Sequence, residues 1–275
     1  MRLVIDLQGA QGSNAKRGIG RYSRELALAM VRAPRQHDVV VALNGTMLET
    51  AEDLSARFSA LLPPSHLRSW FSAPSSAGPY AAQAARVVRA QFLASLQPDI
   101  VHVSSIFEGL GDGAVTFSPP GLERLPLVGT CYDLIPLIRH KEYLEGQGVL
   151  APHRRWYYAG LHEMFLAEGL LAISESSRQE AITHLGFDAG KVSNIQAGIG
   201  PAFRPPETDE AAAAARLAHY GVQTPYILFV GAGDPRKNEQ GFIEAYARLP
   251  AELRALHQLC LLYTSDAADD LLCVD

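Results

Sequence analysis

Two cations stand side by side after a glycine-rich turn in the last third of the chain. The apolar segment 226–230 has the length of a β-strand, and Gly231 and Gly233 follow it. Arg236 and Lys237 come next, before residues with the apolar periodicity of a helix. Glycines let the backbone approach an anion, a helix N-terminus presents free N–H groups, and cations add charge and donors. The pattern predicts a site for a phosphorylated small molecule, and a diphosphate suits two cations best.

Two other anion-binding motifs do not fit this segment. A dinucleotide fingerprint requires a third glycine where Arg236 stands, and the glycine-to-lysine spacing of a Walker loop is absent. A strand-to-helix turn with two solvated cations is the plainer alternative. Ligands of open α/β sheets bind at the carboxyl ends of strands, and because the pair follows such an end, a ligand site is favoured.

A second glycine loop follows the first strand signal, which spans residues 3–7. The loop covers residues 8–20 and contains Gly18 and Gly20, and the helix after it begins near Tyr22. The loop is too long for an NAD-binding fingerprint, and the spacing Gly18-x-Gly20-x-x-Ser23 lacks the third glycine. An NAD-dependent oxidoreductase is therefore not favoured.

The composition is that of a globular protein with a hydrophobic core. The 275 residues are 48% hydrophobic and 19% charged, and the net charge of −5 gives no indication of nucleic-acid binding. Three cysteines without paired spacing argue against a disulfide framework or a zinc site. The sequence has no signal-peptide pattern and no apolar run near ~18 residues, so a cytoplasmic protein is expected. Basic clusters at 16–24 and 153–155 are either solvated faces or contacts for a phosphate or an anionic lipid surface.

Strand and helix signals alternate along residues 1–200, which predicts an α/β domain with a parallel sheet and helices on both faces. Consecutive valines at 39–41 are typical of a strand buried on both faces. Ser177 and Glu180 have the spacing of a capping box at a helix start, within a run of N-cap residues that begins at Ser174. Strands are predicted at 3–7, 38–43, 99–103, 127–131, 170–173 and 192–197, and helices at 50–62, 80–96 and 152–167.

A second domain is predicted to begin at about residue 206. Residues 198–206 are rich in proline and glycine, as linkers often are, and an alanine-rich helix is expected over 208–220. After the strand at 226 and its helix, a further strand is expected to begin at 256. Residues 260–275 show no turn signal and no helix or strand pattern, and we interpret them as a non-native or frame-shifted tail. We therefore expect domains at 1–200 and 206–259, the second incomplete, and exposed apolar strand surface that favours aggregation.

Six segments together resemble family 4 glycosyltransferases, in particular members that build bacterial O-antigen-type polysaccharides. The sequence Tyr-Asp-Leu-Ile-Pro at 132–136 resembles the usual His-Asp-Leu-Ile-Pro, and residues 17–23 are similar to the opening glycine loop of such members. The resemblance covers about residues 1–259, in the segments 5–11, 17–23, 99–109, 132–136, 172–178 and 229–238. It implies the GT-B fold, in which two Rossmann-like domains face each other across a cleft.

The resemblance implies the retaining transfer of a hexose from a nucleotide-diphosphate sugar to a saccharide or lipid-linked acceptor. Arg236 and Lys237 match the family's cationic pair, which neutralises the diphosphate as it leaves, and fixed cations at that position lower the barrier. A loop-to-helix turn is an equal alternative for Gly20. The residues assigned to donor binding besides the cations are Gly18, Gly20, Gly231 and Gly233.

Four further residues are assigned from the same resemblance. Asp133 is a catalytic candidate that either orients a hydroxyl or caps a turn. His102 and Glu108 are acceptor-side candidates, with an ordinary strand residue and a solvated loop carboxylate as their alternatives. Arg21 is the third acceptor-side candidate.

Two departures from the family pattern matter. Tyr132 replaces the commoner histidine, so the donor-sugar contact of that position is not carried over. The family's Glu-x7-Glu region, which contacts donor sugar and ribose, is expected beyond Leu259 and is not found there, so the chain is expected to be inactive as it stands.

The remaining expectations concern cofactors and partners. No Asp-x-Asp occurs in the sequence, so neither a metal nor another cofactor is expected. The implied partners are a nucleotide-sugar donor, an oligosaccharide or lipid-linked acceptor and the inner membrane surface, without nucleic acid. A non-catalytic sugar- or nucleotide-binding Rossmann domain is the alternative function.

Overall fold

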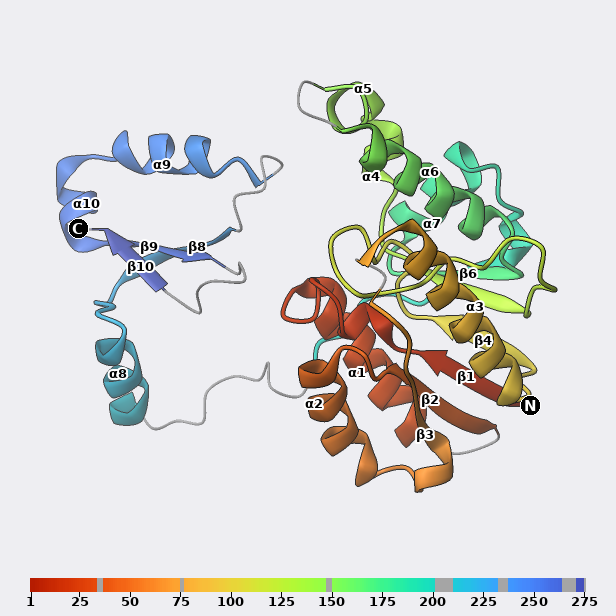
Figure 1. The fold of residues 1–275 in the computed structure, drawn as a ribbon. Helices are drawn as coiled ribbons and strands as arrows, with labels where there is room; N and C mark the ends of the chain where they lie inside the picture. The colour runs from red at the N-terminus through yellow and green to blue at the C-terminus, as the bar shows by residue number, and fades with distance from the viewer. Residues whose placement is uncertain are drawn as a thin grey trace. The chain divides into compact units, whose positions relative to one another are not determined.

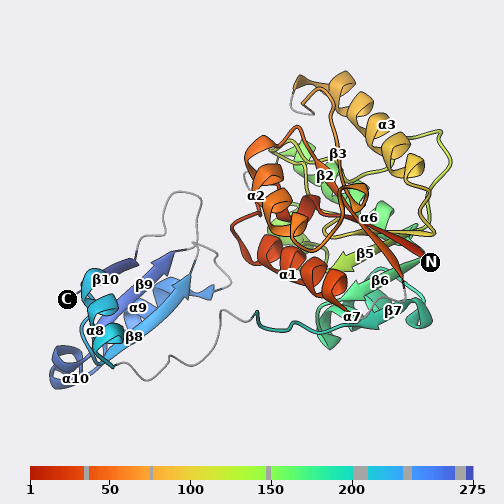
Figure 2. The same ribbon diagram turned by 90° about the horizontal axis from the view of Figure 1, so that it is seen from below.

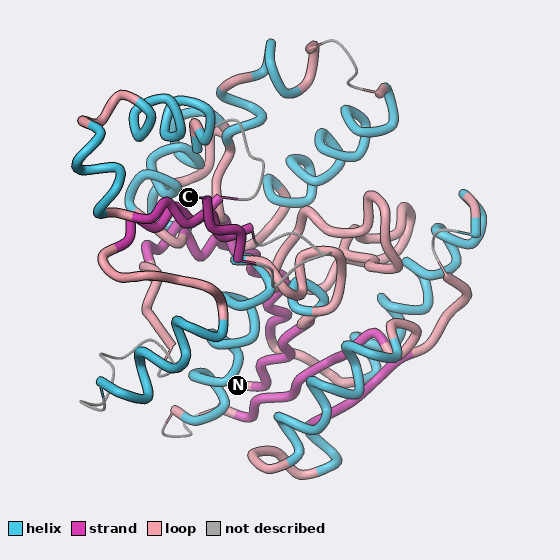
Figure 3. The backbone as a smooth tube through the Cα atoms, turned by 90° about the vertical axis from the view of Figure 1, so that its left-hand side faces the viewer, coloured by secondary structure: helices cyan, strands magenta, loops and turns pink. Residues whose placement is uncertain are grey.

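The computed structural model describes residues 1–33, 37–74, 77–146, 150–200, 210–231, 237–263 and 271–274. The chain forms two compact units, Met1–Gly198 and Ile199–Asp275 (Figure 1). Both units are built from helices and strands (Figure 3). Within the described ranges, no helix is long and apolar enough to cross a membrane.

The first unit is built on a parallel sheet of seven strands in the order β3-β2-β1-β4-β5-β6-β7. Strands β2 and β3 lie on one side of β1 and strands β4 to β7 on the other, so the direction of winding reverses between β1 and β4. Such a reversal leaves a crevice at the carboxyl ends of the two diverging strands, where ligands of open α/β sheets bind. The strands are β1 (Arg2–Asp6), β2 (Asp38–Asn44), β3 (Leu67–Trp70), β4 (Ile100–Val103), β5 (Leu127–Cys131), β6 (Gly169–Ala172) and β7 (Val192–Asn194).

Helices cover both faces of this sheet (Figure 2). Neighbouring residues of a strand point to opposite faces, so Val4 and Ile5, both fully buried, belong to different cores. The core around Ile5 includes α1 (Gly18–Arg32) and α2 (Leu48–Ser59), and the core around Val4 includes α3 (Pro79–Ser95), α6 (Ala151–Phe165) and α7 (Glu175–His184). Shorter helices are η1 (Gln8–Ala10), η2 (Pro64–His66), α4 (Ile135–Ile138), α5 (His140–Tyr143) and η4 (Ala189–Lys191).

The structure confirms the parallel α/β architecture but differs from the sequence pattern in two details of this unit. The pattern does not predict β3, because its two central residues are exposed and polar and form no apolar run. Helix α7 is capped by Ser174, whose Oγ accepts from the Ser177 amide at 3.0 Å, rather than by Ser177. Glu180 accepts from the Leu134 amide at 2.9 Å, so it ties α7 to the segment after β5 instead of closing a capping box.

The second unit contains a sheet of three strands in the order β10-β9-β8. Strands β8 and β9 pair in parallel, and β10 pairs antiparallel with β9. The ring of Phe229 in β8 packs against Phe242 of α9, with ring centroids 4.7 Å apart. The elements are α8 (Glu210–His219), β8 (Tyr226–Gly231), α9 (Glu239–Ala247), α10 (Ala251–Leu256), β9 (Gln258–Tyr263) and β10 (Leu271–Val274).

The interpretation of residues 260–275 as lacking any strand is wrong for the part of them that the structure describes. Residues 258–263 form β9, and Cys260 and Leu261 are buried, as the apolar run Leu-Cys-Leu-Leu at 259–262 requires. Residues 271–274, a second apolar run, form β10. Strand β9 begins at Gln258 rather than at 256 because residues 251–256 are taken up by α10.

Candidate functional site

Two loops meet at the carboxyl ends of β1 and β4, where the direction of winding reverses. The amide of Ser104, which follows β4, donates to the carbonyl of Asp6 at 3.1 Å, and the Gly9 amide donates to Ser104 Oγ at 3.1 Å. A Cβ at Gly9 would lie 2.7 Å from Ser23 Oγ and 2.9 Å from Ser104 Oγ, so only glycine permits this approach. The loops after β1 and β4 and the start of α1 therefore pack together at the carboxyl ends of these strands, which we call the site edge.

Helix α1 begins at this edge, and its two N-terminal glycines have different roles. Gly20 packs against the preceding loop, since a Cβ there would lie 2.3 Å from the Asn14 carbonyl oxygen, which accepts from the Gly20 amide at 3.1 Å. Gly18 is exposed, and a Cβ there would meet nothing within 4 Å. Arg17 at the N-cap makes no side-chain capping bond, and the Asn14 carbonyl accepts from one amide of the first turn, that of Gly20. Arg21 is exposed on the first turn.

Glu108 lies in the loop after β4 and is only 3% exposed, so the alternative of a solvated loop carboxylate is wrong. Its two carboxyl oxygens accept from the Asn14 side-chain amide at 3.1 and 3.0 Å, which joins the loops after β1 and β4. Burial raises the pKa of Glu108 to about 7, although hydrogen bonds from Ser105 and Asn14 oppose the shift. The carboxyl group can therefore be protonated or ionised near neutral pH.

Tyr132 and Asp133 follow β5 at the same edge of the sheet. The Tyr132 hydroxyl lies 2.9 Å from Ser23 Oγ and donates to the Ser104 carbonyl at 3.1 Å, and burial raises its pKa. The hydroxyl thus connects α1 to the end of β4. Asp133 Oδ1 accepts from the Ile135 amide at 3.0 Å, which closes a turn just before α4, the structural alternative for this residue.

His102 does not face the site edge. It is 2% exposed within β4, and its Nε2 lies 2.9 Å from Thr130 Oγ1 on β5. Burial lowers the pKa of His102 to about 4, so the ring is neutral at physiological pH. This enclosure in the sheet agrees with the alternative of an ordinary strand residue for His102.

In the second unit, Gly231 is buried at the end of β8, where a Cβ would lie 2.3 Å from the Phe229 ring. Lys237 is exposed just before α9. Asn238, which lies between Lys237 and the start of α9, is in the left-handed region with φ of 52°. Gly233 and Arg236 lie outside the described residues. No group of three histidine, cysteine, aspartate or glutamate side chains is placed to hold a metal ion in the part of the chain that is described.

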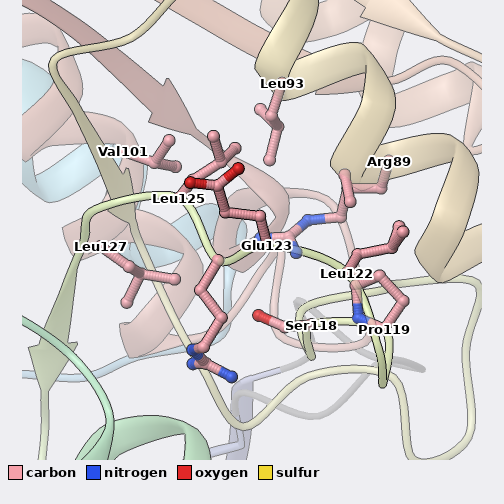
Figure 4. Close-up of a pocket in the computed structure, with 11 residues that line it drawn as sticks. Arg89, Leu93, Val101, Ser118, Pro119, Leu122, Glu123, Leu125 and Leu127 are labelled. Carbon is pink, nitrogen blue, oxygen red and sulfur yellow. The ribbon is translucent and has the colours of Figure 1, made fainter.

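Among the pockets in the described part of the first unit, two bear on the site. The first lies between α3 and residues 118–127, with leucines as its walls and Arg89 on one side (Figure 4). It is lined by Val101 and Leu127 near the amino-terminal ends of β4 and β5, and also by Arg89, which pairs with Asp6 at the end of β1. The second is lined by Arg86, by residues 108–109 and 114–117 of the loop after β4, and by Trp156, and it adjoins Glu108.

Sequence reasoning missed the side chains that hold the two loops together. Asn14 donates to Glu108, and Asp112 accepts from the Ser13 amide at 2.7 Å. Gln8 and Asn44, at the ends of β1 and β2, are fully buried and bonded to the loop after β4. The available signal was a polar residue directly at the end of an apolar strand, which must find a partner when it is buried.

Comparison with known proteins identifies the family. The sequence profile of Glycosyltransferase Family 4 matches residues 16–203, more than half of the chain. The chain is 30% identical over 272 residues to a serotype-specific mannosyltransferase WbdA of Escherichia coli, covering 96% of this chain and 32% of the relative. It is 29% identical over 119 residues to the O-antigen chain mannosyltransferase B of Escherichia coli, covering 43% of this chain and 31% of the relative. The chain thus spans about a third of the length of these curated relatives.

Solved structures show the same fold at low sequence identity. Anabaena Alr3699/HepE in complex with UDP-glucose matches with a TM-score of 0.56 and 15% identity over 94% of this chain and 59% of that chain. UDP-GlcNAc 2-epimerase from Neisseria meningitidis matches with a TM-score of 0.50 and 10% identity over 95% of this chain and 65% of that chain. Taken with the profile match, these likenesses show that the chain belongs to glycosyltransferase family 4 and has the α/β fold of the GT-B glycosyltransferases.

Proposed function

We propose that this chain binds a nucleotide-diphosphate hexose for transfer to a saccharide or lipid-linked acceptor, with retention of anomeric configuration and without a metal. The observation that carries the proposal is the exposed Gly18 at the start of α1, beside the β1–β4 reversal. There an exposed Gly18 leaves room for an anion to approach the backbone, and no side chain caps the helix. Gly20 holds the preceding loop against the helix start and contributes indirectly.

The second unit is proposed to supply charge to the leaving nucleoside diphosphate. Lys237 is exposed at the start of α9, where a cation and a helix N-terminus act together on an anion. Arg236 is proposed as its partner from the sequence, and Gly231 and Gly233 as the turn that lets the backbone approach. Fixed positive charge placed where negative charge develops stabilises the transition state without a metal ion.

Two residues of the first unit are proposed to serve the acceptor, and a third to orient a neighbouring segment. Glu108 carries a carboxyl group that can exchange a proton near neutral pH, beside the loop that precedes α1. Arg21 is exposed on the first turn of α1 and can donate to acceptor hydroxyls or to a phosphate. Asp133 is proposed to orient the segment after β5 rather than to touch the reacting atoms, because its carboxylate closes the turn before α4.

The identity of the hexose is proposed from the relatives. Both Escherichia coli relatives are named mannosyltransferases, which favours mannose as the transferred sugar. The structural neighbour in complex with UDP-glucose makes UDP-hexoses the alternative donors to test.

A membrane contact is proposed on the outer face of α6. This face exposes Tyr158 and Phe165 together with Arg154 and Arg155, and Leu150 precedes it, 59% exposed. The helix has one acidic residue, Glu163, which is buried and paired with Arg124. Apolar and basic side chains without exposed acids suit an anionic lipid surface at the cytoplasmic face. Co-sedimentation with anionic but not neutral vesicles, abolished by Arg154→Glu with Arg155→Glu, tests this contact.

Calorimetric titration with GDP-mannose and with UDP-glucose tests the central proposal. One of the two is expected to bind, and Lys237→Met is expected to weaken that binding roughly tenfold or more, as loss of a charge-assisted hydrogen bond does. Lys141→Met, an exposed lysine of α5, is the matched control and should change nothing. If neither nucleotide sugar binds, the proposal fails. Transfer to a saccharide acceptor, with the product's anomeric configuration read by NMR, separates an active enzyme from a binding domain.

A further inference from the structure

Five buried polar side chains form a connected group beneath the site edge. Asp6, Gln8, Gln11, Asn44 and Arg89 are each at most 3% exposed, and they come from β1, the segment after it, β2 and α3. Arg89 Nε donates to Asp6 Oδ2 at 2.7 Å, and Gln8 Nε2 donates to both Asp6 oxygens at 3.1 Å. Asn44 Nδ2 donates to Gln8 Oε1 at 3.2 Å. We call this group the Gln8–Asn44 network.

The network is hydrogen-bonded to the backbone of the loop after β4 at Gly113 and Val115. Gln8 Nε2 donates to the Val115 carbonyl at 2.7 Å, while Gln8 Oε1 accepts from the Val115 amide at 2.8 Å. The side-chain amide therefore pairs with Val115 as a neighbouring strand would. Asn44 Nδ2 donates to the Gly113 carbonyl at 3.0 Å. These three bonds hold the far end of the loop that begins at Ser104.

The same loop holds the residues that lead into α1. Between Ser104 and Val115 it carries Glu108, which accepts from Asn14, and Asp112, which accepts from the Ser13 amide. The Asn14 carbonyl in turn accepts from the Gly20 amide on the first turn of α1. Hydrogen bonds at both ends of the loop after β4, joined by the backbone of the loop itself, thus connect the buried network to the helix N-terminus.

The loop has little freedom to adjust between its two ends. Gly109 has φ of 88°, and a Cβ there would lie 2.3 Å from the Ala114 carbonyl oxygen, so residues 109–114 close a tight turn. Thr116 Oγ1 donates to the Ile106 carbonyl at 2.6 Å and closes the loop further. A displacement of Val115 is therefore passed on to Glu108 and Asp112 rather than absorbed by a flexible segment.

We propose that Gln8 and Asn44 are positioning residues for the donor site: through Gly113 and Val115 they fix the loop that holds residues 13–14, and thereby set the approach to the α1 N-terminus. The inference rests on the proposed function for its ligand, the nucleotide-diphosphate sugar. It adds residues that touch no ligand and are remote in sequence from the loop that they place. Their satisfied polar groups define one loop position, whereas apolar packing at the same points would leave the loop free to shift.

The test replaces Gln8 by a side chain of similar size without an amide. Gln8→Met removes both bonds to Val115 while keeping the volume, and Gln91→Met, an exposed glutamine on α3, is the matched control. Asn44→Asp, which loses the donor to Gly113, is the second variant in case Gln8→Met does not fold. The carboxyl carbon of Glu108 is followed by NMR as a function of pH, and the affinity for GDP-mannose and UDP-glucose is measured by titration.

In the wild-type chain Glu108 is expected to titrate at about 7, and in Gln8→Met or Asn44→Asp its midpoint should fall toward 4.5, because the displaced loop admits water. Donor affinity should fall about tenfold or more, as misplacement of a site loop does. An unchanged Glu108 midpoint and unchanged donor affinity in a variant that is only less stable would overturn the positioning role. If neither nucleotide sugar binds the wild-type chain, the proposed function fails, and the Glu108 midpoint alone then decides whether the network places the loop.

Discussion

Replacing Arg89 by methionine should destabilise the first unit severely. The Arg89 guanidinium lies 2.7 Å from Asp6 Oδ2, and the two side chains are 3% and 0% exposed. Arg89→Met keeps the aliphatic volume but leaves the Asp6 carboxylate buried, with the Gln8 amide as its remaining side-chain donor among the described residues. Removing one partner of a buried ion pair costs about 3–5 kcal/mol, because the remaining charge keeps its desolvation penalty without compensation. For a unit of this size the melting temperature should fall by roughly 6–20 °C.

Tryptophan fluorescence during urea unfolding measures this loss. Both tryptophans of the chain, Trp70 and Trp156, belong to the first unit, so the signal reports that unit alone. Arg57→Met is the control, because Arg57 pairs with Asp53 at 2.8 Å on the surface, where both side chains are about half exposed. Such exposed pairs contribute about 0–1 kcal/mol.

The double variant Asp6→Asn with Arg89→Met distinguishes a buried charge from lost packing. If the unpaired carboxylate is the cause, the neutral amide should recover much of the stability lost in Arg89→Met. The reasoning is refuted if Arg89→Met is no less stable than Arg57→Met, or if the double variant is no more stable than Arg89→Met alone.

Four further predictions concern pH, the glycines of α1 and metal ions. The pKa of Glu108 is raised from 4.5 to about 7, so its contribution to stability, about 3 kcal/mol, is present below pH 4.5 and lost as pH rises to 7. The urea midpoint of the wild-type chain should therefore decline between pH 4 and 8, and the midpoint of Glu108→Gln should lack this decline. The pKa of His102 is lowered from 6.5 to about 4, so its contribution to stability is present above pH 6.5 and lost as pH falls to 4. His102→Met should lack that loss. If neither Glu108→Gln nor His102→Met changed the dependence of the urea midpoint on pH, both pKa shifts would be contradicted. Gly20→Ala should lower the free energy of unfolding by about 1–3 kcal/mol, because its Cβ meets the Asn14 carbonyl at 2.3 Å. Gly18→Ala, whose Cβ points into open space, should change the free energy of unfolding by no more than about 0.5 kcal/mol. Equal losses in urea unfolding would contradict this difference between the two glycines. Donor affinity should be the same with EDTA as with added Mg²⁺, and a loss on chelation would refute a metal-independent site.

The sequence alone carries the fold and the family, because both depend on patterns that neighbouring residues impose. Alternating strand and helix signals predict the parallel sheet, and the consecutive valines at 39–41 lie in β2, where Val40 and Val41 are buried. The segment 127–131 is predicted as a strand and is β5. The motifs of the glycine loop and of residues 132–136 point to family 4, which the profile match over residues 16–203 confirms. Local periodicity and ordered motifs survive in a single sequence because each needs only a few neighbouring residues.

Tertiary structure alone decided the chemical state of the candidate residues. A histidine in a strand and a glutamate in a loop look alike in sequence, but burial makes His102 a neutral core residue and brings the pKa of Glu108 to about 7. Gly18 and Gly20 differ only in what lies beside them, open space for one and the Asn14 carbonyl for the other. The Gln8–Asn44 network joins residues that are as far apart in sequence as Gln8 and Val115. Desolvation, steric contact and hydrogen bonding across the sheet depend on distances that folding sets, and no local pattern of residues contains them.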